Sequence, residues 1–459
     1  MIHKYSMNSL NIVLDIHSGS VHIVDDVTFR ILDYYKENDL AEIKNILKNN
    51  FTQDEIEESY NEIKSLVNDE VLFSEDIYEE YAQTIDNRNP IIKAMCLHVT
   101  HDCNLKCKYC FAEEGEYQSG KRSLMSFETG KKALDFLIKS SGTRKNLEVD
   151  FFGGEPLMNF DVVKKLVEYG REEEKKHNKN FRFTITTNGV LLNDEIEKYI
   201  NEHMHNIVLS IDGREEVNNL MRPNYSGKGT YDKIVPKFQS IAEKRNQTDY
   251  YVRGTFTKYN LDFGEDVLHL ADLGFKQVSV EPVVADVNLD YAICEDDVQT
   301  IYDEYERLAV KISERKKEDK DFNFFHFMID LSGGPCVAKR LVGCGAGTEY
   351  VAITPSGEIY PCHQFVGNTD FEIGNLGEGI KREDLVSQFT KLNVYTKDEC
   401  KNCWAKFYCS GGCLSNAYNF SNDLTKPYEI GCKLQRKRVE CAIMIKVAEA
   451  LDSTETEEE

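Results

Sequence analysis

Short apolar runs alternate with amphipathic segments through the middle of the chain. The strand-like runs are residues 94–100, 147–152, 181–187, 207–212, 250–257 and 277–284. Apolar residues at helical spacing fill the intervals, at residues 126–140, 161–176, 193–202, 231–243 and 262–273. Repeated strand–helix units with short apolar strands predict a parallel sheet. We therefore expect an α/β fold over residues 91–320, a partial (β/α)6 barrel whose chemistry lies at the carboxyl ends of its strands.

The segment before this domain has a different pattern. Residues 11–23 contain two alternating β-branched runs around a Ser-Gly-Ser turn, which predicts a hairpin. Helical spacing of apolar residues follows at 25–35, 40–49 and 53–68. This order predicts a small winged-helix-like module over residues 1–85, and the acidic, polar stretch that follows it predicts a linker.

A third unit follows the sheet domain. Residues 297–320 predict one long charged helix, and residues 333–432 are rich in Cys, Gly and turn residues with few periodic segments. Apolar burial alone is not expected to hold such a segment together, so bound metal is the expected substitute. We place this cysteine-rich domain at residues 330–445.

Composition and charge indicate where the protein is found and which partners it does not bind. The chain has 14 cysteines and a formal charge of −24. No apolar run reaches the ~18 residues that span a bilayer, and the first residues lack the apolar core of a signal peptide. We therefore expect a cytoplasmic protein whose thiols serve metal binding, catalysis or packing rather than disulfides. The negative charge argues against nucleic acid or an anionic membrane as a partner, because such binding depends on Lys and Arg.

Three cysteines follow the first predicted strand of the sheet domain. Cys103, Cys107 and Cys110 have the spacing C-x3-C-x2-C. Three thiolates this close can each bind one iron of a [4Fe–4S] cluster, which leaves the fourth iron open. The alternative is a zinc knuckle completed by His98 or His101.

This spacing resembles the signature of the radical S-adenosylmethionine (SAM) superfamily. The resemblance implies that the three cysteines are catalytic and that the open iron binds SAM, whose reductive cleavage gives a 5′-deoxyadenosyl radical. Gly153-Gly154-Glu155 after the second strand resembles the motif that holds the amino group of SAM. Other positions that match SAM-contacting residues of the family are Asn188, Ser210 and Arg222, and Tyr109 inside the cysteine loop is expected to pack on the adenine of SAM.

Seven further cysteines resemble the SPASM domain. The resemblance implies two auxiliary [4Fe–4S] clusters, and so three clusters in all. The outer cluster would be held by Cys400, Cys403, Cys409 and Cys432, and the inner cluster by Cys344, Cys362 and Cys413. Two complete clusters need eight thiolates. Either Cys336 supplies the eighth, or a cysteine of the substrate does; the competing interpretation is that both clusters are saturated and serve structure or electron transfer.

The amino-terminal module suggests a peptide substrate. A winged-helix fold often binds DNA, but residues 36–90 are strongly acidic. The module instead resembles the recognition element of ribosomal-peptide modifying enzymes, where a leader peptide adds as an extra strand. Together the three units resemble the thioether-forming maturases, most closely those acting on six-cysteines-in-forty-five (SCIFF) peptides. The implied partners are a precursor peptide with a leader sequence and a low-potential electron donor of the flavodoxin or ferredoxin type.

Two other functions stay open at this stage. An enzyme similar to anaerobic sulfatase maturases shares the clusters but oxidises Cys or Ser to formylglycine. It needs a carboxylate base near the substrate carbon, and no motif in the sequence identifies one. A non-enzymatic iron–sulfur regulator that binds peptide or DNA would need neither the Gly-Gly-Glu motif nor an open iron.

Overall fold

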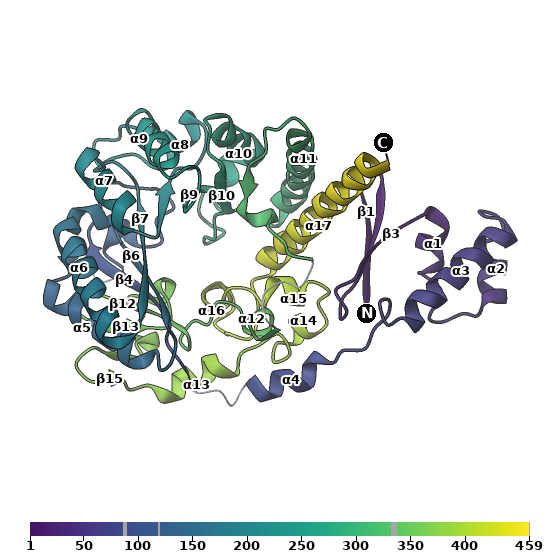
Figure 1. Cartoon of the computed structure of the whole chain (residues 1–459), viewed down its shortest axis with the longest axis horizontal. Coiled ribbons are helices and arrows are strands. Elements are labelled where there is room, and N and C mark those ends of the chain that lie inside the picture. Colours follow the sequence, from purple (N-terminus) through teal and green to yellow (C-terminus); the bar gives the residue numbers. More distant parts are fainter. Residues whose placement is uncertain (86–89, 118–119, 332–336, 459) are drawn as a thin grey trace.

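The centre of the molecule is a mostly parallel sheet. The computed structural model describes residues 1–85, 90–117, 120–331 and 337–458 (Figure 1). All six predicted strands are present there as parallel neighbours in chain order. They are β4 (Ala94–His101), β6 (Asn146–Gly153), β7 (Asn180–Thr187), β8 (Asn206–Ser210), β9 (Tyr250–Phe256) and β10 (Gln277–Pro282).

Alternating side chains give this sheet two different faces. Alternate residues such as Val149, Phe151 and Phe183 are fully buried, and the Phe151 and Phe183 rings stack at 5.5 Å. Each such burial contributes about 1.5–3 kcal/mol. The predicted helices cover this face in an arc (Figure 1). They are α5 (Phe127–Ser140), α6 (Phe160–His177), α7 (Asp194–His203), α9 (Tyr231–Lys244), α10 (Phe263–Asp272) and α11 (Val298–Lys317), with the short α8 (Glu215–Met221) between α7 and α9.

The cysteine-rich segment extends the same sheet, which the sequence pattern did not predict. Strand β12 (Tyr350–Ile353) pairs with β4 in parallel, and three antiparallel strands follow it. These are β13 (Glu358–Tyr360), β14 (Gly374–Asn375) and β15 (Gly379–Ile380); the short β5 (Ser123–Leu124) and β11 (Asn323–Phe324) complete the sheet in the described residues. Strands of two to four residues are too short to produce a readable alternation.

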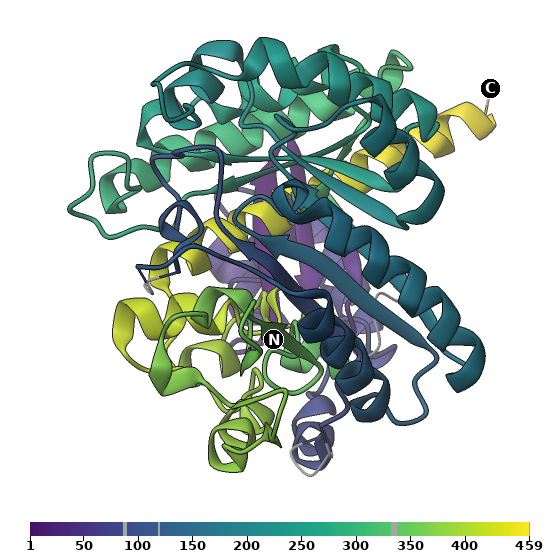
Figure 2. The ribbon, with the colours of Figure 1, turned by 90° about the vertical axis from the view of Figure 1, so that its left-hand side faces the viewer.

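A long terminal helix crosses the molecule. Helix α17 (Glu429–Glu458) starts in the cysteine-rich region and packs along α11, burying Ile443 and Met444 (Figures 1 and 2). The sequence analysis did not predict this helix, and residue 445, the expected end of the third domain, lies inside it. The other helices of this region are α12 (Val337–Val342), α13 (Glu383–Lys391), α14 (Asp398–Lys401), α15 (Lys406–Cys409) and α16 (Leu414–Ser421). No helix in the described part of the chain is long and apolar enough to cross a membrane.

The amino-terminal module contains one strand more than predicted. Its antiparallel sheet has the order β1 (Ile2–Met7), β2 (Leu10–Asp15), β3 (Val21–Val24), so the expected hairpin is flanked by an additional first strand. Helices α1 (Asp26–Ile31), α2 (Leu40–Leu47) and α3 (Gln53–Asn68) pack on it, and α4 (Tyr78–Ile85) follows. Side chains of Asp39 and Thr52 cap α2 and α3. The assignment as a winged helix stays a prediction.

This module packs against the carboxyl-terminal region. The His3 ring on β1 stacks on Trp404 at 3.7 Å, and its Nε2 lies 2.9 Å from the Glu440 carboxylate of α17. Between the module and α4, Asp76 binds the Lys406 ammonium at 2.8 Å. Strand β1 accordingly runs beside α17 in Figure 1.

Candidate functional site

The first cysteine group lies in the loop that follows β4. Cys103, Cys107 and Cys110 are partly exposed, free thiols. Burial raises the pKa of Cys103 to about 12 and that of Cys107 to about 11. The neighbouring cysteines of the group contribute to raising both pKa values. The thiols of Cys103 and Cys107 are therefore protonated at neutral pH, and a metal that binds them must displace protons.

The two glycines of the Gly-Gly-Glu motif hold this loop in place. A Cβ on Gly153, whose φ is +122°, would lie 2.0 Å from the Thr100 carbonyl oxygen, and a Cβ on Gly154 would lie 2.0 Å from that of Asp102. The Gly154 and Glu155 amides donate to the same two oxygens at 2.9 and 2.8 Å. The two glycines therefore give room to the base of the cysteine loop.

Glu155 is a fully buried carboxylate at the end of β6. Its Oε1 accepts from the Thr187 hydroxyl at 2.7 Å and its Oε2 from the Asn188 amide at 2.8 Å. Burial raises the pKa of Glu155, whereas these hydrogen bonds lower it. The Glu155 side chain is thereby held in one orientation near Cys103, and its negative charge raises the pKa of the Cys103 thiol.

Asn188 and Ser210 end neighbouring strands but differ in their contacts. The Asn188 Nδ2 donates to Asn104 at 2.8 Å and lies 3.8 Å from the Cys103 sulfur, so this residue positions the cysteine loop. Ser210 is partly exposed beside Arg253 of β9, and its hydroxyl makes no hydrogen bond within the described residues.

Asp212 is a site residue that the sequence analysis missed. The Tyr109 hydroxyl donates to both Asp212 oxygens at 2.7 and 2.8 Å, and Arg222 donates to the Tyr109 oxygen at 2.6 Å. Burial raises the pKa of Asp212 to about 6. Tyr109 is thus fixed by polar contacts instead of only packing on a ligand. The available signal was an Asp at the end of a predicted strand, directly before Gly213.

Arg222 offers a buried donor at the cysteine loop. Backbone hydrogen bonds from Lys106 to Pro223 and from Lys108 to Met221, at 2.8 and 2.9 Å, brace the loop against the segment that carries Arg222. The Arg222 Nε is buried without a hydrogen-bond partner. Buried donors are normally satisfied, and guanidinium groups suit carboxylates. A cluster on the three cysteines, with the carboxylate of SAM at Arg222, therefore fits the residues present.

The two histidines considered as zinc ligands contact each other. His98 Nδ1 lies 3.0 Å from His101 Nε2, and His101 stacks on Tyr117 at 4.5 Å. Burial lowers the pKa of His101 to about 4. Within the described residues, no three His, Cys, Asp or Glu side chains are arranged to hold a single metal ion.

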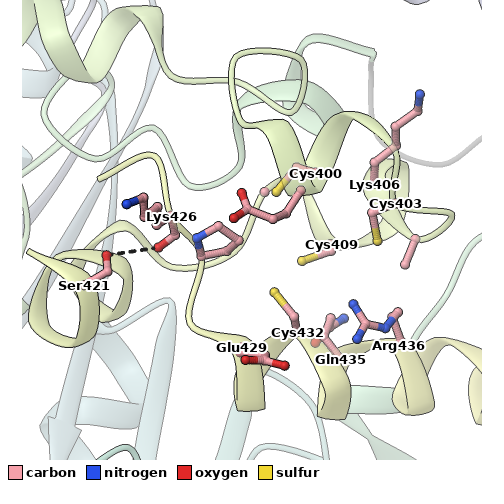
Figure 3. A pocket seen from close by; sticks show the side chains of 14 residues that line it. Cys400, Cys403, Lys406, Cys409, Ser421, Lys426, Glu429, Cys432, Gln435 and Arg436 are labelled. Atoms are coloured by element: carbon pink, nitrogen blue, oxygen red, sulfur yellow. Dashed lines mark hydrogen bonds between the residues drawn. The ribbon is translucent and has the colours of Figure 1, made fainter. Parts of the chain in front are cut away.

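Four cysteines of the carboxyl-terminal region surround one cavity. Its volume is about 470 Å³, and its lining includes Cys400, Cys403, Cys409 and Cys432 (Figure 3). Cys432 reaches the cavity from α17, and the other three come from the α14–α15 segment. Burial raises the pKa of Cys400 to about 11 and that of Cys432 to about 12. The neighbouring thiols also contribute to raising these pKa values. The structure thus brings together the four residues predicted as outer ligands.

Three other cysteines form a second group in this region. Burial raises the pKa of Cys362 to about 12, and Cys413 and Cys344 lie close enough to raise it further. These are the residues predicted for the inner cluster. Cys336, the alternative eighth ligand, lies outside the described residues.

Two parts of the chain match known protein families. Residues 97–246 match the radical SAM superfamily, and residues 344–404 match SPASM, an iron–sulfur cluster-binding domain. The chain carries a radical SAM domain and a SPASM domain. Cys103, Cys107 and Cys110 lie in the radical SAM match, while Cys409, Cys413 and Cys432 lie beyond the end of the SPASM match.

Solved structures show the same α/β radical SAM fold. Native anSMEcpe with bound AdoMet and Cp18Cys peptide has a TM-score of 0.64 at 21% identity, covering 78% of this chain and 99% of that one. Streptococcus suis SuiB bound to precursor peptide SuiA has a TM-score of 0.52 at 17% identity, covering 94% of this chain and 98% of that one.

Curated relatives extend over most of the chain. The radical SAM cyclopropyl synthase TigE of Paramaledivibacter caminithermalis is 24% identical over 90% of this chain and 87% of its own length. A cysteine-type anaerobic sulfatase-maturating enzyme of Clostridium perfringens is 24% identical over 71% of this chain and 89% of its own length. The chain is therefore similar over most of its length to a cyclopropyl synthase and to a sulfatase-maturating enzyme.

Proposed function

We propose that this protein is a radical SAM peptide maturase that forms intramolecular thioether cross-links from Cys to carbon in a ribosomally made, Cys-rich precursor peptide. The observation that carries the proposal is the grouping of ten cysteines into sets of three, four and three, with a buried Arg and Glu beside the first set. The proposed cofactors are SAM and three [4Fe–4S] clusters.

The residues around the first set would bind and orient SAM. Cys103, Cys107 and Cys110 would hold the cluster, which when bound would supply the electron that cleaves SAM to a 5′-deoxyadenosyl radical. Arg222 would hold the SAM carboxylate through its unpaired Nε, and the Gly153-Gly154-Glu155 segment would face the SAM amino group. Tyr109, Asn188 and Ser210 would complete the site from the cysteine loop and the ends of β7 and β8.

The inner auxiliary set has three described ligands for four irons. A cysteine of the substrate would complete it, with Cys336 as the alternative. A metal-bound thiol is deprotonated. The substrate cysteine that forms the cross-link would then be bound as a thiolate by the same protein that generates the radical.

The amino-terminal module would bind the leader of the precursor. Strand β3 pairs only with β2 among the described residues, so its other edge has backbone groups free for an added strand. The adjacent α3 carries Asp54, Glu55, Glu57 and Glu58 and suits a neutral or cationic peptide better than nucleic acid. The SuiB match omits 6% of this chain, less than the length of this module, so it includes part of the module.

Formylglycine formation is the second candidate. The Clostridium perfringens sulfatase-maturating enzyme supports it, because it shares most of its own length with this chain. That match leaves 29% of this chain uncovered, whereas the likeness to SuiB, which was solved with its precursor peptide SuiA, leaves 6% uncovered. The longer likeness favours a peptide substrate with a recognition module.

One experiment separates the two reactions. The reduced, anaerobic protein is incubated with SAM, a flavodoxin- or ferredoxin-type donor and a Cys-rich precursor peptide, and the product is mapped by tandem mass spectrometry. A thioether removes two hydrogens per cross-link and one free thiol from the peptide, whereas formylglycine gives an aldehyde. The variant with Cys103→Ala, Cys107→Ala and Cys110→Ala should release no 5′-deoxyadenosine; continued release would refute the site.

A further inference from the structure

Lys397 is a buried lysine without a carboxylate partner. Its side chain is 2% exposed, and its Nζ donates to the Gly411 carbonyl oxygen at 2.7 Å. No ion pair to an acidic residue is found for it in the described part of the chain. Lysine is rarely buried unless it is paired, because an unpaired ammonium loses its hydration. The position therefore calls for an anion that the acidic side chains do not provide.

Cysteine sulfurs are the candidates for that anion. The thiols that act electrostatically on the Lys397 ammonium are Cys400, Cys409, Cys413 and Cys432. Three of them belong to the outer set and Cys413 belongs to the inner set. Gly411, which holds the ammonium, lies in the chain between Cys409 and Cys413. The Lys397 ammonium thus lies near thiols of both auxiliary sets.

A second buried lysine nearby shows the usual arrangement. Lys406 is also 2% exposed, but its Nζ binds the Asp76 carboxylate at 2.8 Å and lies 4.7 Å from the Tyr395 ring centre. Its charge is therefore balanced by an acidic residue, whereas the charge of Lys397 is balanced only when the cysteines are anionic.

We propose that the Lys397 ammonium is a positive counter-charge shared by the two auxiliary clusters, and that it raises their reduction potentials. The inference rests on the proposed function in so far as it requires those clusters. A [4Fe–4S] cluster with its thiolates is anionic and gains one more negative charge on reduction. A fixed positive charge close by stabilises the reduced form more than the oxidised form.

The test is a redox titration of the full-length, cluster-loaded protein followed by EPR. In Lys397→Met we expect the reduction equilibrium of the auxiliary clusters to fall about tenfold, which is 59 mV for one electron. The outer cluster should shift most, because three of its thiolates act on the lysine. The radical SAM cluster should titrate as in the wild type. Lys397→Arg should restore the auxiliary potentials. Lys179→Met, which removes an ammonium that donates to the Gly142 and Arg144 carbonyls outside the cysteine-rich region, should leave them unchanged.

The other possible results of this titration also support or overturn the role proposed for Lys397. Unchanged auxiliary potentials in a fully loaded Lys397→Met protein, or an equal shift of all three clusters, would overturn the inference. Iron lost from the auxiliary clusters in Lys397→Met but kept in Lys397→Arg would support it, because a charge is then needed to retain them. Iron lost from both variants would indicate packing and overturn it. A wild-type protein that binds no auxiliary clusters would instead refute the proposed function.

Discussion

At the scale of single residues, the first site depends on contacts between distant parts of the sequence. Tyr109 and Asp212 lie 103 positions apart, yet they share two hydrogen bonds, and Arg222 joins them from a third element. Each of these side chains is held by the others. Substitutions here should change the binding of SAM before they change the fold.

Replacing Asp212 by Asn tests this arrangement. The change removes the negative charge that orients Arg222, so we expect the Kd for SAM to rise about tenfold, or ~1.4 kcal/mol. Because burial raises the pKa of Asp212 to about 6, the wild-type affinity should fall as the carboxylate is protonated below that pH, and the variant should not respond. Calorimetry with SAM between pH 5 and pH 8 measures both effects.

A buried Glu–Arg pair on α11 is the control for this experiment. Glu304 is buried and binds Arg307 at 2.6 Å. Glu304→Gln should reduce stability but leave the affinity for SAM unchanged. Equal affinities in wild type and Asp212→Asn across the pH range would contradict the role given to Asp212.

Gly154 provides the other prediction at this scale. In Gly154→Ala the added Cβ would lie 2.0 Å from the Asp102 carbonyl oxygen, so the base of the cysteine loop must move. We expect the affinity of the three-cysteine site for its cluster to fall roughly 10–100-fold. Iron analysis and 5′-deoxyadenosine release measure the loss. Gly142→Ala, whose Cβ meets nothing within 4 Å, is the control, and a similar loss there would point to a general effect.

At the scale of elements, the strands with regular alternation were predictable and the irregular ones were not. The run at 147–152 became β6 (Asn146–Gly153), but β12 to β15 have two to four residues and give no period. The spacing of Cys103, Cys107 and Cys110 and the resemblance of the later cysteines to the SPASM domain predicted which cysteines belong together, because both depend on the order of residues alone. Lys397 and Asp212 escaped detection since their roles depend on contacts formed only after folding.

Metal removal should affect the short elements first. Helices α14 and α15 have four residues each, too few to be stable alone. Without iron, four thiols face a cavity of about 470 Å³ that nothing fills. We expect chelation to increase hydrogen exchange in residues 398–413 by at least about tenfold, while β6 and β7 stay protected. Uniform exchange across both regions would show that the cysteine-rich region does not depend on metal.

At the scale of the whole molecule, three parts of the chain meet around the cysteine-rich region. It continues the central sheet through β12, receives Cys432 from α17, and contacts the amino-terminal module at Trp404 and Lys406. A peptide held by the module is therefore attached to the same body that carries the clusters. Attachment raises the local concentration of the reactive part of the peptide.

The outer edge of β3 is where this view can be tested. Ile23, in the middle of that strand, is an apolar residue with 44% of its surface exposed. A leader strand beside β3 would cover Ile23 with its own side chains. Replacing Ile23 by Glu should weaken that contact by about 1.5 kcal/mol and raise the KM for the full precursor about tenfold, with kcat unchanged.

Ile46 on α2 is the matched control for Ile23. It is 41% exposed in the same module but lies on a helix instead of the strand edge, so Ile46→Glu should leave the KM unchanged. A precursor lacking its leader should react equally slowly with wild type and both variants. If Ile23→Glu and wild type show the same KM for the full precursor, the leader binds elsewhere, because an added strand at β3 cannot avoid the residue at its centre.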